Sequence, residues 1–500
     1  MHAIGRSNNV MNIVVIGSGF GGLSAAIRLQ AQGHSVTLVE KLDKPGGRAY
    51  VFEQDGFKFD AGPTIITAPW LIRELFEVAG QQMEDRLTLT LLDPFYNIRF
   101  PDGSVFRYNA NREQLIAQVR AFSNGRDVDG YDRFLKSTEE IFKTGMALLD
   151  QPFPTVGSML KVLPDLIRLR ADRSVASYVD RFISDERLKQ VFSFHPLLVG
   201  GNPFRASAIY ALIHTLEQQW GVWFVMGGTG ALVQALVDLF TSLGGVLHLN
   251  AEVGSINIDR ATKRATGVTL TRGERLAADA VVCNGDVAMA TQKLVPSWAR
   301  PRMSDQKIAK YRYSMSLFVI YFGTDKQYPD TAHHEILLGP RYRELLEDIF
   351  ERKLLADDFS LYLHRPTATD PSLAPPGHDC WYVLSPVPHL GANVDWERAS
   401  QRYRDRIMQY LEEHYLPGLQ SHIVTEHRID PRYFEGTLNS YLGSAFGPEP
   451  TLLQSAYLRP HNQSQDISNL YFCGAGTHPG AGLPGVIASG KIVAGMIGNA

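Results

Sequence analysis

The feature that most constrains this chain is a glycine-rich turn that links an apolar strand to a helix. Residues 13–16 (Ile-Val-Val-Ile) are apolar and β-branched, which is typical of a buried parallel strand. They lead into Gly17-Ser18-Gly19-Phe20-Gly21-Gly22, which fits G-x-G-x-x-G, and a helical pattern then runs to Gly33. A second strand closes at Glu40. Strand, turn, helix, strand and acid in this order predict a dinucleotide-binding unit.

Each part of this unit has its own physical role. Gly17 allows the tight turn, Gly19 lets the backbone approach a pyrophosphate, and Gly22 lets the helix pack on the strand. Free N–H groups at the helix start favour phosphate, and an acid at the end of the second strand binds ribose hydroxyls. We therefore predict cofactor contacts from Gly17, Gly19, Phe20, Gly21, Gly22, Glu40 and Lys41.

The loop after Glu40 favours FAD over NAD. It contains Gly46-Gly47-Arg48 and, further on, Asp60-Ala61-Gly62-Pro63-Thr64, whereas a simple NAD domain would continue with another strand and helix. This segment resembles the FAD-binding domain of the flavin amine oxidase and phytoene desaturase superfamily. The resemblance implies that Arg48 approaches the phosphates and that the Gly-Pro-Thr run lies beside the flavin. It adds Gly47, Arg48, Pro63 and Thr64 to the predicted site.

A second glycine cluster, CGAGTHPGAGLPG, occupies residues 473–485. An apolar run precedes it and a helical pattern with small residues follows it, so this is again strand, loop and helix start. Such a loop supplies N–H donors and a positive helix end near the flavin edge where charge grows on reduction. We therefore expect both glycine clusters to bracket one FAD, with Gly474, Gly476 and Val486 in contact. In flavin amine oxidases a valine at the place of Val253 lies against the adenine.

Length and pattern predict several units in one chain. A chain of 500 residues is too long for a single simple core. We expect an α/β fold, α+β overall, in which a Rossmann-like FAD-binding domain carries an inserted, sheet-containing substrate domain and a helical region. The expected boundaries are residues 1–10 for a flexible extension, 11–75, 225–295 and 465–500 for the FAD-binding domain, 76–110 and 296–464 for the substrate domain, and 111–224 for the helical region.

Composition excludes several function classes. The net charge of −3 gives no reason to expect nucleic acid. The three cysteines form no C-x-x-C pair, so we expect no metal site or disulfide, and reduced thiols in the cytoplasm. The sequence contains no uninterrupted run of about 18 apolar residues. We therefore expect no membrane-spanning helix and only peripheral membrane contact. The basic, amphipathic stretch that begins at Met159 fits either a membrane surface or an ordinary surface helix.

From Met11 to Ala500 the chain resembles the bacterial phytoene desaturase family. The resemblance is carried by the first unit and by FSFHPLLVGGNPF, WGVWFVMGGTGALVQAL and FCGAGTHPGAGLPGVIASGK. It implies FAD-dependent desaturation of 15-cis-phytoene to lycopene or neurosporene, by hydride transfer to flavin N5 and proton loss. It further implies reoxidation by a quinone or oxygen, and peripheral docking on the cytoplasmic side of the cell membrane.

Some assignments stay open at this stage. The aromatic runs 192–195 and 220–224 fit an apolar tunnel or ordinary core, and His195 and His214 fit acid–base groups or core histidines. No catalytic base can be chosen. Alternative functions are another carotenoid desaturase or isomerase, a flavin amine oxidase, or a prenyl-lipid chaperone of the same fold; the intact glycine motif argues against the chaperone.

Overall fold

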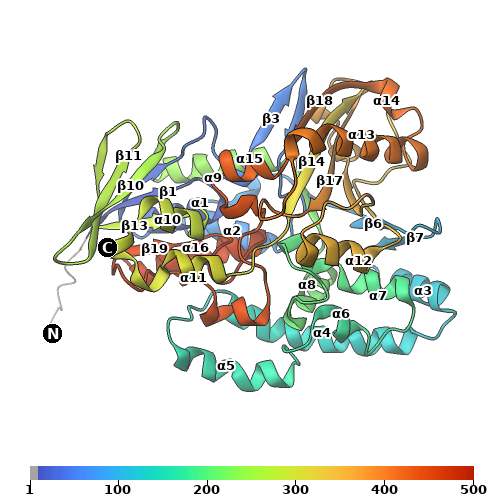
Figure 1. The fold of residues 1–500 in the computed structure, drawn as a ribbon, viewed down its shortest axis with the longest axis horizontal. Coiled ribbons are helices and arrows are strands. Elements are labelled where there is room, and N and C mark those ends of the chain that lie inside the picture. Colours follow the sequence, from blue (N-terminus) through green and yellow to red (C-terminus); the bar gives the residue numbers. More distant parts are fainter. Residues whose placement is uncertain (1–9) are drawn as a thin grey trace.

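The computed structural model describes residues 10–500. A parallel five-stranded sheet lies at the centre of one of its layers (Figure 1). Strands from distant parts of the chain lie in the order β19-β13-β1-β2-β9. Since they are parallel, their carboxyl ends share one edge, where a ligand can contact several loops. The strands are β1 (Asn12–Ile16), β2 (Ser35–Val39), β9 (Val246–His248), β13 (Ala280–Cys283) and β19 (Leu470–Phe472).

Alternating side chains of this sheet bury against different layers. Ile13 and Val15 face a cluster with α1 (Phe20–Ala31), α9 (Thr229–Ser242) and α16 (Leu483–Ile497). Val14 faces the opposite layer. That layer comprises β10 (Val253–Asp259), β11 (Arg264–Leu270), β12 (Arg275–Ala277) and α10 (Val287–Leu294). The sheet is therefore buried on both faces, as a parallel sheet requires.

A second, mostly antiparallel sheet of seven strands stands beside this core. Its order is β18-β14-β17-β16-β15-β6-β7, and the parallel pairing of β6 with β15 joins an early hairpin to the later strands. Helix α13 (Trp396–His414) packs on one face. The strands are β6 (Tyr96–Arg99), β7 (Val105–Tyr108), β14 (Ser316–Thr324), β15 (His334–Leu337), β16 (Leu361–His364), β17 (Asp379–Val387) and β18 (Ile423–Ile429).

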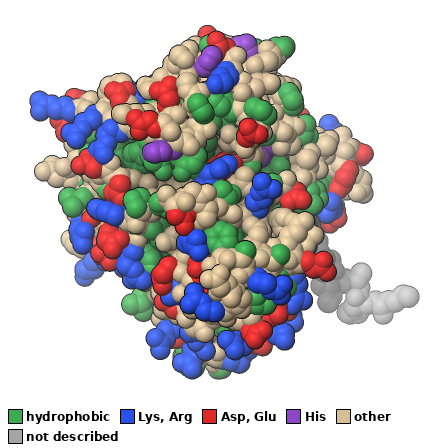
Figure 2. Space-filling model, turned by 90° about the vertical axis from the view of Figure 1, so that its right-hand side faces the viewer, with side chains coloured by type: hydrophobic (Ala, Val, Ile, Leu, Met, Phe, Trp, Pro, Cys, Tyr) green, Lys and Arg blue, Asp and Glu red, His purple; other side chains and the backbone are tan. Residues whose placement is uncertain are grey.

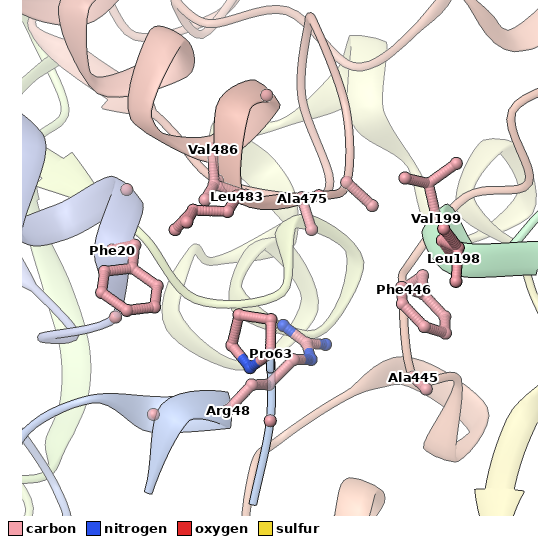
Figure 3. A pocket seen from close by; sticks show the side chains of 18 of the residues that line it. Phe20, Arg48, Pro63, Leu198, Val199, Ala445, Phe446, Ala475, Leu483 and Val486 are labelled. Atoms are coloured by element: carbon pink, nitrogen blue, oxygen red, sulfur yellow. The ribbon is translucent and has the colours of Figure 1, made fainter. Parts of the chain in front are cut away.

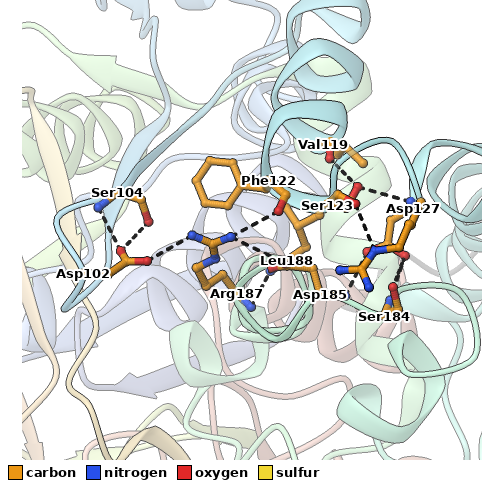
Figure 4. A network of polar contacts seen from close by, with 11 residues as sticks. Asp102, Ser104, Val119, Phe122, Ser123, Asp127, Ser184, Asp185, Arg187 and Leu188 are labelled. Atoms are coloured by element: carbon orange, nitrogen blue, oxygen red, sulfur yellow. Dashed lines mark hydrogen bonds and ion pairs between the residues drawn. The ribbon is translucent and has the colours of Figure 1, made fainter.

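The helical region lies below this sheet in Figure 1. Figure 4 shows how polar contacts fasten it: Asp127 accepts hydrogen bonds from the backbone of Ser184 and Asp185, and Arg187 bridges Asp102 and the Phe122 carbonyl. The helices are α3 (Arg112–Ser123), α4 (Val128–Leu149), α5 (Val156–Arg168), α6 (Val175–Val179), α7 (Glu186–Ser193) and α8 (Leu212–Trp220). Within residues 10–500, no helix combines the length and apolarity needed to cross a bilayer.

Shorter elements connect these layers. A hairpin is formed by β3 (Val51–Gln54) and β4 (Phe57–Asp60). Strand β5 (Leu89–Leu91) pairs with β8 (Trp223–Val225). The predicted extension, residues 1–10, lies outside the described residues except for Val10, and the domain boundaries stay a prediction. The remaining helices include α2 (Pro69–Glu77), α11 (Asp305–Lys310), α12 (Tyr342–Glu347), α14 (Leu419–His422) and α15 (Pro431–Gly436).

Candidate active site

The two glycine clusters meet in space at the carboxyl edge of the five-stranded sheet. A Cβ on Gly21 would lie 3.0 Å from the Gly474 Cα and 2.5 Å from the Asn284 Oδ1. Asn284 follows β13, and its amide donates to the Gly17 carbonyl at 3.4 Å. The side chain of Asn284 therefore sits between the two loops, and contacts this close are open only to glycine.

A cavity of about 650 Å³ opens from these loops into the interior (Figure 3). Phe20 and Val486 lie toward one end in the view, Pro63 and Arg48 lie in the middle, and Leu198 and Phe446 lie toward the other end. Thirteen of the fifteen predicted cofactor residues line this cavity: Gly17, Gly19, Phe20, Gly21, Glu40, Lys41, Gly47, Arg48, Pro63, Thr64, Val253, Gly474 and Val486.

Gly22 and Gly476 are not among the lining residues. A Cβ on Gly22 would lie 2.0 Å from the Gly17 carbonyl oxygen, so this glycine lets α1 pack against the turn. A Cβ on Gly476 would lie 2.7 Å from the Val287 Cγ1, at the start of α10. Protein atoms approach both glycines closely, and their predicted contact with the cofactor stays a prediction.

Glu40 is buried at the end of β2 and lines the cavity. Its Oε2 accepts hydrogen bonds from the Ser18 backbone N–H at 2.8 Å and from the Ser18 hydroxyl at 2.7 Å. Its Oε1 accepts from the Leu42 N–H at 3.0 Å. These bonds fix the carboxylate beside the glycine turn while leaving each oxygen further acceptor capacity.

Arg48 lies in the middle of the cavity wall. Its guanidinium donates to the Ser440 hydroxyl at 2.7 Å, and its Nε has no protein partner. Burial lowers the pKa of Arg48, and the nearby Asp286 carboxylate opposes that shift. Burial disfavours the charged form of Asp286 too, and for this carboxyl group it raises the pKa. A buried guanidinium with an unpartnered nitrogen fits an anionic or hydrogen-bonding ligand in the cavity.

The helix starts at both loops also fit a cofactor with a pyrophosphate. Gly19 is the N-cap residue of α1 and Gly482 is that of α16, so no side chain caps either helix. Their first N–H groups therefore lack the usual side-chain acceptor. Together with Glu40 and Arg48, this arrangement fits FAD, whose flavin ring exchanges hydride with a bound substrate.

The other end of the cavity is apolar. Residues from α5, α8 and the loop before α8 line it, namely Met159, Val162, Leu166, Phe194, Leu197, Leu198, Val199, Leu212, Ile213 and Leu216. Phe194 is the member of the run 192–195 that reaches the cavity; Phe192 and Phe224 are core residues. Motif spacing could not identify these positions, since any large apolar residue serves here.

His195 and His214 are buried with polar partners. The His195 Nε2 lies 3.1 Å from the Glu217 Oε2, and the His214 Nδ1 contacts the Tyr108 hydroxyl. Glu217, which sequence reasoning missed, is fully buried and lines the cavity. No local pattern marks it, because its two partners, Tyr96 and His195, come from separate segments of the chain.

Three other histidines form a buried cluster next to the seven-stranded sheet. One ring nitrogen each of His333, His334 and His364 lies within 4.8 Å of the other two, which makes this the one group among residues 10–500 close enough to share a metal ion. The Nδ1 of each ring already has a partner: Thr369, Tyr362 and His334 respectively. Burial lowers the pKa of all three, that of His333 to about 3, so the rings are neutral.

Comparisons with known proteins agree with this site. Residues 20–497 match the family of flavin containing amine oxidoreductases. Among solved structures, an oxidoreductase from Methanosarcina mazei superposes with a TM-score of 0.63 at 18% identity, covering 97% of this chain and 100% of that one. Cyclohexylamine oxidase from Brevibacterium oxydans gives 0.57 at 18% identity, covering 98% of each chain. The chain therefore belongs to the flavin-containing amine oxidoreductases and is an FAD-dependent enzyme.

Curated relatives show to which group within this family the chain is most similar. A lycopene-forming phytoene desaturase from Pseudescherichia vulneris is 51% identical over 97% of this chain and 98% of its own length. One from a Paracoccus strain is 50% identical over 96% of each. A neurosporene-forming phytoene desaturase from Rhodobacter capsulatus is 43% identical over 97% of this chain and 94% of its own length. Within its family, this chain is a member of the bacterial phytoene desaturases.

Proposed function

We propose that this chain desaturates 15-cis-phytoene to lycopene in carotenoid biosynthesis. The observation that carries the proposal is one continuous cavity with glycine loops at one end and aliphatic and aromatic side chains at the other. Bound FAD supplies the hydride acceptor. The protein holds a long, uncharged polyene against it and keeps water out, because most residues that line the far half of the cavity are apolar.

The end product is the finer part of the proposal. Lycopene-forming relatives share 50–51% identity with this chain, and neurosporene-forming ones share 42–43%. This ordering favours lycopene, with neurosporene as the second candidate. The reduced flavin would pass its electrons to a quinone or to oxygen, and a quinone shares the lipid phase of the substrate.

We further propose that α5 docks on the cytoplasmic side of the cell membrane. No residue of α5 is buried. Met159, Val162 and Leu166 line the cavity, while Leu160 and Ile167, which do not line it, expose 59% and 65% of their surface. The helix is therefore apolar both toward the cavity and toward the outside, which suits a route for a lipid-soluble substrate.

Charge at the same end of the molecule supports this docking. Figure 2 shows Lys and Arg side chains gathered over the lower end, the end that the helical region forms in Figure 1. Lys161, Arg168, Arg170 and Arg173 are exposed there. Basic side chains next to an apolar surface attract anionic lipid headgroups.

The deciding experiment is anaerobic incubation of the holoenzyme with phytoene in liposomes. Flavin bleaching together with new polyene absorbance is expected, and chromatography of the extract identifies the end product. Lycopene supports the proposal, and neurosporene corrects its last step. Bound FAD without any new polyene would overturn it in favour of an isomerase or an amine oxidase.

A further inference from the structure

A buried carboxylate faces the apolar part of the cavity. Glu217 lies on α8 and exposes none of its surface to outside solvent, yet it lines the cavity beside Ile213 and Leu216. Ionised carboxylates are rarely buried without a cation. Among residues 10–500, no Lys or Arg nitrogen lies within ion-pair distance of this one. Its position therefore calls for a chemical reason.

Two donors hold the Glu217 carboxylate from behind. The Tyr96 hydroxyl donates to Oε1 at 2.7 Å, and the His195 Nε2 lies 3.1 Å from Oε2. Burial, followed by the charge of Glu217, raises the pKa of Tyr96 far above its usual value, so the phenol stays protonated and keeps donating. Both partners are themselves fully buried. The carboxylate is thus fixed in position rather than free to rotate.

The other carboxylates that line the cavity have partners of a different kind. Glu40 is held by Ser18 and Leu42 at the glycine turn. Glu252 lies 3.9 Å from the Lys41 ammonium, and Asp286 caps α10 and faces Arg48. Glu217 alone among these four stands in the apolar half with no cationic side chain near it.

We propose that Glu217 is the catalytic carboxylate of desaturation: it stabilises positive charge on the polyene and accepts the proton. This inference rests on the proposed function. One carbon loses hydride, with its electron pair, to the flavin, which leaves a cation spread over the neighbouring double bonds. The adjacent C–H bond then breaks, its electron pair becomes the new C=C bond, and the proton passes to a Glu217 oxygen. Atoms and electrons balance with FAD as the one oxidant.

A carboxylate without a Lys or Arg partner suits this step. A carbocation inside an apolar cavity has no water to stabilise it, and a fixed anion in a medium of low polarity acts strongly on it. The carboxylate needs no further activation, because the carbon next to a cation is a strong acid. His195 and Tyr96 act as positioning residues, since both contact the carboxylate from behind.

The test compares Glu217→Gln with wild-type holoenzyme in anaerobic single turnovers on liposomal phytoene. We expect flavin reduction to slow at least about 100-fold, with FAD content unchanged and the apparent KM within about threefold. Glu335→Gln is the control, because Glu335 is equally buried but pairs with Arg99 outside the cavity. It should reduce flavin at the wild-type rate.

A second pair of variants separates charge from structure. Glu217→Asp keeps the carboxylate, and Glu217→Asn replaces it by an amide on a side chain of the same length as Asp. The Asp variant should therefore reduce flavin at least about tenfold faster than the Asn variant. Equal rates in this pair, a wild-type rate in Glu217→Gln, or loss of FAD from every Glu217 variant would each overturn the proposal. A wild-type enzyme that makes no polyene would instead refute the proposed function.

Discussion

The two ends of the cavity are built by different rules. At the cofactor end, backbone atoms approach so closely that only glycine fits: a Cβ on Gly490 would lie 2.7 Å from the Gly21 carbonyl oxygen, where α16 crosses α1. At the α5 end, no residue of the helix is buried and Pro164 interrupts its hydrogen bonding. Positions at the cofactor end therefore accept only particular residues, whereas positions along α5 need only be apolar.

The largest effect should follow from adding a side chain to the last glycine of the G-x-G-x-x-G turn. Gly22→Ala would place a Cβ 2.0 Å from the Gly17 carbonyl oxygen, so α1 must leave the turn. We expect more than about 3 kcal/mol of destabilisation and purification without FAD. The exposed position Ala31, in the same helix, is the control: Ala31→Gly should cost about 1 kcal/mol and keep FAD. If the Gly22→Ala protein is yellow and fully loaded with FAD, the cofactor end does not require glycine at this position.

Substitutions at the α5 end should leave the fold unchanged but weaken membrane binding. Leu160→Asp with Ile167→Asp removes two exposed apolar side chains, which should weaken binding to anionic vesicles at least about tenfold. FAD content and melting temperature should not move. The matched control is Val246→Asp with Val424→Asp, two residues of similar exposure outside the helical region. Equal vesicle binding by both double variants would refute docking through α5.

The same contrast explains what the sequence could predict. The strand–turn–helix motif, Glu40 and the second glycine loop specify identity, so thirteen of fifteen predicted contacts line the cavity. The sequence could not show that Val287, almost two hundred positions earlier, approaches Gly476. Glu217 could not be chosen, since Tyr96, His195 and the cavity converge on it only after folding. The histidine cluster likewise needs the pairing of β15 with β16.

Acid–base behaviour sharpens the comparison at the cofactor end. Asp60 accepts hydrogen bonds from the Thr229 and Gly230 N–H groups at the start of α9, and burial raises its pKa from 3.8 to about 6. The native state therefore holds a proton that the unfolded state has lost between these values, so stability falls as pH rises through this window. The difference corresponds to ~3 kcal/mol at most.

Asp60→Asn tests this dependence. Asparagine binds no proton here, so the loss of stability between pH 4 and 6 should disappear in the variant. Urea unfolding of both proteins at pH 4, 5, 6 and 7 measures it. Parallel curves for wild type and variant would show that Asp60 does not titrate in this range.

The smallest effect separates packing from ligand contact at Gly476. A Cβ there would meet Val287 Cγ1 at 2.7 Å, so Gly476→Ala should cost about 1–2 kcal/mol and leave FAD affinity unchanged. Gly495, on the exposed side of α16, has nothing within 4 Å of its would-be Cβ, so Gly495→Ala should stabilise by up to about 1 kcal/mol. FAD titration and thermal melts of both variants decide. Weaker FAD binding by Gly476→Ala at unchanged stability would confirm the predicted contact of Gly476 with the cofactor, and the glycine loop after β19 would then contact FAD along more of its length.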